Sequence, residues 1–227
     1  MIAIKQTTLA IFCLLPLCVS LPASAQDWYV AGGATLSLLN DPKSQIENAP
    51  TPGATLKIID ELSSTGWGGH LALGHRFDRL RVEAEVGRTR NDADFYTVTS
   101  PISNRLPQTG GDTITRIMAN AYYDIPFGGI EPYLGFGIGE AMVDVTTNAS
   151  RPFGPPTAPV QLIDDQVNGF TWQAIAGVAV PVSETFALTA QFRYLDAGTL
   201  HGKDTRGQPF QTSIAGPAID LGVRYSF

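Results

Sequence analysis

The side chains that could do chemistry are five arginines and four carboxylates set within stretches of alternating apolar residues. Each lies where every second residue is polar or small. Arginine forms paired hydrogen bonds to carboxylates, and here the two charges are nearly balanced. We therefore expect a structural ion-pair network inside the protein. Its members are Arg76, Arg81, Glu83, Glu85, Arg116, Asp124, Arg193, Asp220 and Arg224.

Catalysis and metal binding need spacings that this chain lacks. The three histidines, His70, His75 and His201, do not have the spacing of a metal site. A nucleophile, a base and an orienting group are also not found together. Glu83 and Glu85 lie two apart beside an arginine, which favours ion pairing over acid–base work. We predict no catalytic residue, no cofactor and no metal.

Eight segments alternate with period two, which is typical of β-strands. Each is long enough to cross a bilayer as a tilted strand of roughly 9–11 residues. In the fifth, Leu134 and Val143 have opposite parity, and a bulge near Gly139 would reconcile them. The segments are 27–39, 66–78, 80–90, 113–125, 130–145, 168–180, 185–196 and 215–227.

The connections between these segments alternate in length. Short turns follow the second, fourth and sixth segments, and long segments rich in turn-forming residues follow the others. Strands that run up and down place the two kinds at opposite ends, as in outer-membrane barrels. The long connections, expected to be loops that bind any surface ligand, are 40–65, 91–112, 146–167 and 197–214.

Residues 1–25 have the layout of a cleavable signal peptide. Lys5 supplies a positive start, Leu9–Val19 is largely apolar, and Ala23–Ala25 matches a cleavage site. Removal of this segment leaves 26–227 as one exported domain.

Composition excludes several classes of protein. The 227 residues carry a net charge of −6, which does not suit a nucleic-acid partner. Charged residues make up only 16%, below the roughly 25% of soluble domains. The only cysteines, Cys13 and Cys18, lie in the predicted signal peptide, so we expect no thiol in the exported protein.

The polar faces and the aromatic residues favour a membrane barrel over a soluble β-sandwich. The polar faces carry paired charges, glycine and threonine without lysine, and aromatic residues cluster near the strand ends. We predict an all-β fold, an eight-stranded antiparallel up-and-down transmembrane β-barrel. The soluble sandwich is the alternative.

Five stretches carry a family resemblance. They are Arg116–Asp124 (RIMANAYYD), Glu131–Gly139 (EPYLGFGIG), Phe170–Gly177 (FTWQAIAG), Phe192–Asp196 (FRYLD) and Val223–Phe227 (VRYSF). Together they resemble the small outer-membrane β-barrel (opacity/porin-like) family of Gram-negative bacteria. The resemblance covers 27–227 and implies insertion into the outer membrane by the barrel assembly machinery, with Tyr225 and Phe227 as the assembly signal.

These observations predict a non-catalytic integral outer-membrane protein with a structural or surface-interaction role in the cell envelope. Its partners would be outer-membrane lipid and lipopolysaccharide, the assembly machinery during biogenesis, and a surface ligand bound by the long loops. A small porin that conducts ions or solutes is the main alternative. A barrel enzyme acting on lipid A is the second alternative.

Overall fold

The computed structural model describes residues 27–47, 55–62, 65–100, 103–149 and 160–227. Within these ranges no helix has the length and hydropathy needed to cross a membrane. The predicted signal peptide lies outside the described residues. The strands are β1 (Trp28–Ser37), β2 (Lys43–Glu47), β3 (Thr55–Leu62), β4 (Gly66–Phe77), β5 (Leu80–Ser100), β6 (Asn104–Asp124), β7 (Glu131–Ala149), β8 (Val160–Pro181), β9 (Phe186–Lys203) and β10 (Pro209–Ser226).

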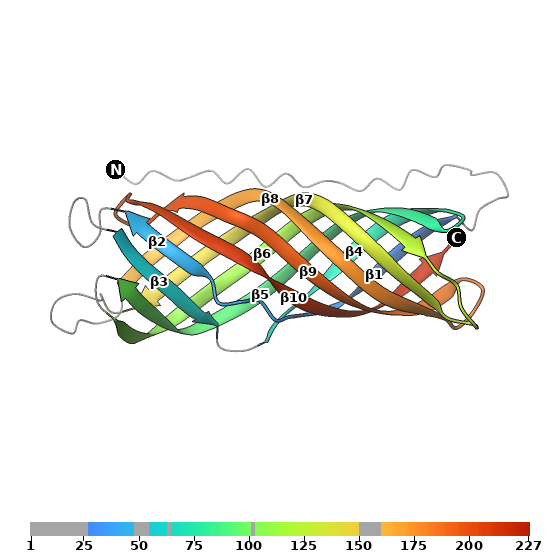
Figure 1. The fold of residues 1–227 in the computed structure, drawn as a ribbon, viewed down its shortest axis with the longest axis horizontal. Coiled ribbons are helices and arrows are strands. Elements are labelled where there is room, and N and C mark those ends of the chain that lie inside the picture. The colour runs from blue at the N-terminus through green and yellow to red at the C-terminus, as the bar shows by residue number, and fades with distance from the viewer. Residues whose placement is uncertain (1–26, 48–54, 63–64, 101–102, 150–159) are drawn as a thin grey trace, which may run out of the picture.

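Eight of these strands close a barrel (Figure 1). Strands β1 and β4 to β10 each pair antiparallel with the next in chain order, and β1 closes the ring by pairing with β10. Closure gives the backbone N–H and C=O groups at the sheet edges hydrogen-bond partners, which lipid cannot supply. The predicted fold class is confirmed.

One end of the barrel holds the short turns and the end of the chain. Asp78 has a φ of 58° in the β4–β5 turn, and Gly128 and Gly129 have positive φ in the β6–β7 turn. The backbone N–H of Phe227 donates to the carbonyl of Trp28 at 2.9 Å, so the last residue is fixed beside the first strand. We call the part of the barrel near this end the turn half.

At the other end, β2 and β3 replace β1 and β4 in the ring. Strand β2 pairs with the start of β10, and β3 pairs with the end of β5. The ring therefore continues beyond the point where β1 and β4 end. We call this part the distal half. It comprises β2, β3 and residues 89–100, 104–115, 140–149, 160–168, 196–203 and 209–216.

The prediction of long loops was therefore largely wrong. Most of the described residues in 91–112, 146–167 and 197–214 continue strands β5 to β10, and 40–65 contains β2 and β3. Their composition suggested loops because threonine, asparagine and aspartate occupy the outer, water-facing positions of these strands. Residues 150–159, a proline-rich part of one predicted loop, lie outside the described residues.

The fifth predicted segment contains no bulge near Gly139. Strand β7 pairs with β6 in continuous register from Ala149 to Tyr133, and its register shift against β8 comes later, between Thr147 and Asn148. Leu134 points outward and Val143 points inward. The opposite parity of these two apolar residues needs no bulge, because the apolar face of β7 is the outer face at Leu134 and the inner face at Val143.

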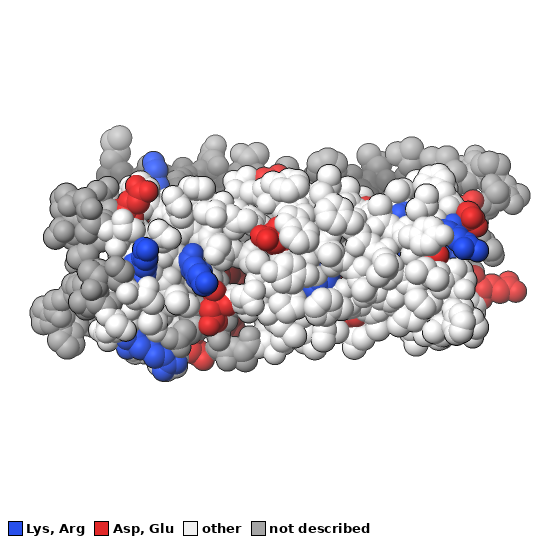
Figure 2. Space-filling view, viewed as in Figure 1, with Lys and Arg blue, Asp and Glu red and all other residues white. Residues whose placement is uncertain are grey.

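This change of sides applies to the whole barrel. In the turn half, large apolar side chains face outward, as Leu71 does with 69% of its surface exposed. In the distal half, apolar side chains face inward and form a core around Val98 and Val143, both 0% exposed. Figure 2 shows charged residues over the half that contains β2 and β3 and at the opposite end, with a nearly uncharged stretch between the middle of the barrel and that opposite end.

Candidate functional site

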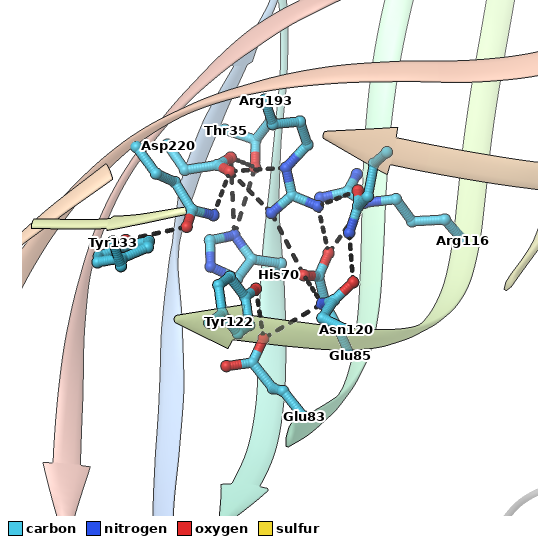
Figure 3. Close-up of polar contacts among 12 residues, drawn as sticks. Thr35, His70, Glu83, Glu85, Arg116, Asn120, Tyr122, Tyr133, Arg193 and Asp220 are labelled. Atoms are coloured by element: carbon cyan, nitrogen blue, oxygen red, sulfur yellow. Dashed lines mark hydrogen bonds and ion pairs between the residues drawn. The ribbon is translucent and has the colours of Figure 1, made fainter. Parts of the chain in front are cut away.

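The nine charged residues predicted from the alternation all point into the turn half of the barrel. Alternation places them inside because their neighbours in sequence face outward. They come from β4, β5, β6, β9 and β10, and Figure 3 shows the central part of the group. Their charged ends meet across the lumen rather than along single strands.

Glu85 lies between two arginines. Its Oε1 accepts from Arg193 Nη1 at 2.6 Å and from Arg116 Nε at 3.0 Å, and its Oε2 accepts from Asn120 Nδ2 at 3.0 Å (Figure 3). The side chains of Glu85 and both arginines are at most 2% exposed. Such buried charges are tolerated because each has a charged partner and further hydrogen bonds.

Asp220 lies on the other side of Arg193. It accepts from the Arg193 guanidinium at 2.8 Å, from Gln191 Nε2 at 2.8 Å and from Thr35 Oγ1 at 2.5 Å. Arg193 thereby joins the carboxylates of β5 and β10 across the barrel. His70 lies beside the same carboxylate, with its Nδ1 at 3.7 Å from Asp220 Oδ1.

A second cluster lies nearer the short turns. Arg81 Nε donates to both carboxylate oxygens of Asp124 at 2.9 Å. Its guanidinium carbon lies 4.5 Å from the ring centre of Tyr122 and 5.0 Å from that of Tyr133. The cation is therefore held by charge on one side and by aromatic faces on the others.

Glu131 is a tenth member of the group that the sequence interpretation missed. Its Oε2 accepts from Arg224 Nη2 at 2.5 Å and from Arg76 Nη2 at 3.1 Å. With it, five carboxylates face five arginines. The signal was present, because Glu131 shares the inward parity of Tyr133 at the start of β7.

Uncharged polar side chains complete the lumen and extend the predicted network, which named charged residues alone. Glu83 accepts from the hydroxyl groups of Tyr29 and Tyr122, both at 3.1 Å, and from Asn120 at 3.3 Å. Gln173 donates to Asn120 at 2.7 Å. In a sequence, a tyrosine whose hydroxyl group lies inside the barrel looks the same as a tyrosine at the membrane interface. Its role as a hydrogen-bond donor in the lumen is therefore not visible from the sequence alone.

Two glycines make space for tyrosine rings in the lumen. A Cβ atom at Gly177 would lie 2.6 Å from the Tyr133 hydroxyl oxygen, and one at Gly74 would lie 2.7 Å from a ring carbon of Tyr29. Each tyrosine ring lies across a glycine on the neighbouring strand. The lumen is thus filled by side chains, as the narrow interior of an eight-stranded barrel allows.

Thr35, His70 and Asp220 form a group that resembles a nucleophile with its base and acid. The Thr35 hydroxyl oxygen lies 3.5 Å from His70 Nδ1 and donates to Asp220. Thr35 is 1% exposed, so a substrate has no access to it. In the described part of the chain, no group of three metal-ligating side chains is arranged to hold an ion.

Comparison with known proteins identifies the family. The model of the outer membrane protein beta-barrel domain matches residues 10–227. This chain belongs to that family. The family predicted from the five motifs is confirmed, and the protein is located in the outer membrane, as predicted.

Individual relatives are distant. Outer membrane protein PagN of Salmonella typhimurium is 24% identical, over 95% of this chain and 97% of that protein. The structure of OprG from Pseudomonas aeruginosa is 14% identical and has a TM-score of 0.53, over 89% of this chain and 96% of that one. The outer membrane protease OmpT of Escherichia coli is 9% identical and has a TM-score of 0.52, over 88% and 97%. These two structures show the fold alone.

Membership of the family orients the barrel. Outer-membrane barrels have short periplasmic turns and longer extracellular segments. The turn half therefore spans the membrane, with its apolar outer face in contact with lipid, and the distal half stands outside the cell. The distal half has the distribution of a water-soluble protein, with an apolar inside and a polar outside.

Proposed function

We propose that this protein is a non-catalytic, non-conducting barrel with a structural or surface-interaction role in the cell envelope. One observation carries the proposal: the lumen is filled twice, by the charged network in the turn half and by the apolar core in the distal half. The void between the two, lined by Arg116, Arg193 and Leu195 among others, has a volume of about 20 Å³. That is room for about one water molecule.

The closed lumen argues against the porin alternative. A conducting pore needs a continuous water-filled path, and the described residues of the two filled layers provide none. The core of the distal half is the stronger barrier, because an ion entering it would lose its hydration and meet mostly apolar side chains, with a few buried polar ones such as Asn91 and Gln108.

Recordings from single barrels in planar bilayers test this proposal. We expect no stable conductance of porin size from the wild-type protein, with a general porin prepared in the same way as the positive control. The double variant Glu85→Ala/Arg193→Ala should stay closed as well, because the apolar core is intact. Stable conductance of porin size from the wild-type protein would refute the proposal.

The absence of catalysis is part of the same proposal. The Thr35–His70–Asp220 group lies in a closed lumen, which leaves an enzyme of the lipid A type without an accessible nucleophile at this place. Incubation of the purified barrel with lipopolysaccharide, followed by mass spectrometry of lipid A, tests this. A modified lipid A that disappears in Thr35→Val would contradict the proposal.

We also propose that residues 1–25 are removed on export and that the last strand is read by the barrel assembly machinery. Tyr225 lies in β10 and Phe227 directly follows that strand; their ring centres are 6.1 Å apart, and both side chains are partly exposed. Sequencing the N-terminus of the membrane-extracted protein should give Gln26 as its first residue. An intact Met1 would contradict the cleavage.

A further inference from the structure

The outer wall of the distal half contains a polar groove between β5, β6 and β7. It has a volume of about 310 Å³, at the lower end of the roughly 300–1,000 Å³ typical of small-ligand sites. Its lining residues offer hydroxyl, amide, carboxylate and guanidinium groups. They are Arg90, Thr109, Gly110, Gly111, Thr113, Asp144, Thr146 and Asn148.

Glycine creates the hollow. Thr113, Gly111 and Thr109 occupy successive outward positions of β6, so the wall lacks a side chain in the middle of the groove. Gly111 has a φ of +144°, a conformation that other residues rarely adopt. A Cβ there would collide with the backbone of Asn91. The register shift of β5 just after Asp92 lies beside this position.

Polar groups surround this hollow in register. Thr113 pairs with Arg90 on one side and Asp144 on the other, and Gly111 pairs with Thr146. In the described part of the chain, the hydroxyl groups of Thr113 and Thr146 have no hydrogen-bond partner. They are free to bind a ligand.

An ion pair and a hydrogen bond hold the two charged residues that line the groove, Arg90 and Asp144. Arg90 Nε donates to Asp92 at 2.8 Å, and Gln166 Nε2 donates to Asp144 at 2.9 Å. The rim therefore presents both charges close together, with neutral hydroxyl and amide groups between them. Such a mixed set suits a ligand covered with hydroxyl groups, which both donates and accepts, better than a bare anion.

The height of the groove identifies the layer it faces. Ile117 is the last large apolar residue on the outer face of β6. At about 3.3 Å per residue and a tilt near 40°, Thr113 to Thr109 lie about 10–20 Å beyond it. A phospholipid headgroup layer ends within about 5–8 Å of the hydrocarbon. The groove thus opens sideways into the saccharide layer of the outer leaflet, rather than outward toward another cell.

We propose that this groove binds a core sugar of lipopolysaccharide in the same membrane, with Thr113, Thr146 and Asn148 as hydrogen-bonding partners and Arg90 beside acidic groups of the saccharide. The inference rests on the proposed surface role of the distal half. The inference adds that the outer wall formed by β5, β6 and β7 binds a membrane-anchored glycolipid.

Thermal unfolding of the purified barrel in liposomes, followed by the shift of the folded band on gels, tests this inference. Three liposome compositions are compared: phospholipid alone, phospholipid with lipid A, and phospholipid with lipopolysaccharide that carries its inner-core sugars. We expect the core sugars to raise the midpoint of unfolding beyond the effect of lipid A. The variant Thr113→Val/Thr146→Val/Asn148→Leu should lose that additional increase and keep the lipid A effect.

A matched control carries comparable changes away from the groove. The variant Thr55→Val/Thr199→Val/Gln211→Leu alters outward-facing polar residues of β3, β9 and β10. It should behave as wild type, because valine suits exposed strand positions. If the core sugars give no additional increase, or if the groove variant keeps it, the inference is wrong.

Free core oligosaccharide, added to barrels in phospholipid alone, separates the two sources of sugar. Stabilisation by the free sugar without any effect of membrane-anchored core would overturn binding within the same membrane. Failure of the proposed function would appear elsewhere, as porin-size conductance of the wild-type protein, and would leave the result for the core sugars unchanged.

Discussion

Glu85 is the residue on which the charged network depends most. It accepts from Arg116 and Arg193, and its side chain is 1% exposed. Removing a carboxylate from such a place leaves two buried cations that face each other without their shared anion. This is a larger penalty than the loss of one surface ion pair, which is worth about 0–1 kcal/mol.

We predict that Glu85→Ala lowers the free energy of unfolding by about 3–5 kcal/mol. Reversible urea unfolding of the barrel in lipid vesicles, followed by tryptophan fluorescence, measures the change. Asp94→Ala, an exposed carboxylate on the outer face of the same strand, is the matched control and should change stability by less than about 0.5 kcal/mol. Equal effects of the two variants would contradict the central place of Glu85.

Glycine at position 177 gives a second prediction at this scale. Gly177→Val should destabilise the barrel by about 1–3 kcal/mol, because the new side chain displaces the Tyr133 ring that lies over it. Gly128→Ala, in a turn with nothing nearby, tests backbone strain alone. The same unfolding measurement applies, and an unchanged stability of Gly177→Val would show that the lumen is not tightly filled.

Alternation allowed the inward positions of the network to be predicted, because parity depends only on sequence. The pairing of the charges could not be predicted in this way. Arg193 and Glu85 are 108 positions apart and meet only because the ring brings β5 and β9 to face each other. Glu131 was missed because it opens its strand, where the alternation has only begun.

Strand β7 shows at the element scale why the predicted strands were too short. Its outward residues are apolar up to Ile138 and, apart from Met142, polar from Glu140 onward. The sequence interpretation explains this change by a bulge near Gly139, because it assumes a single apolar face for each strand. A strand that leaves a membrane for water must exchange its faces, and alternation continues unbroken through that exchange.

We predict that aspartate at two adjacent positions of β7 changes the stability of the distal half to very different extents. Val143→Asp puts a charge into the apolar core and should destabilise the distal half by more than about 3 kcal/mol. Met142→Asp faces outward toward water and should be nearly neutral. Protease treatment of whole cells measures the difference as new cleavage in the distal half.

The turn half should survive in Val143→Asp, since its charged network does not depend on the apolar core. The protected fragment should therefore still shift on gels when heated. Cleavage of both variants to the same extent would mean that β7 does not exchange its faces.

At the scale of the whole molecule, the last residue has a role apart from stability. Phe227 lies on the lipid side, and its backbone closes the barrel on Trp28. We predict that Phe227→Ala costs less than about 1.5 kcal/mol in folded stability but clearly lowers the amount of protein assembled in the outer membrane. Folding yield in vesicles without assembly machinery is the comparison, and an equal loss there would contradict an assembly signal.

The central claim is that the outer surface of the turn half faces lipid and the outer surface of the distal half faces water. Single cysteines at Phe136, Ile138, Asp144 and Thr146 follow one outward row of β7 across that boundary. A spin label at each, in bilayers, reports contact with lipid-soluble oxygen or with a water-soluble nickel complex. We predict oxygen contact at 136 and 138 and nickel contact at 144 and 146. Nickel contact at all four positions would contradict the account, because the turn half would then lie in water.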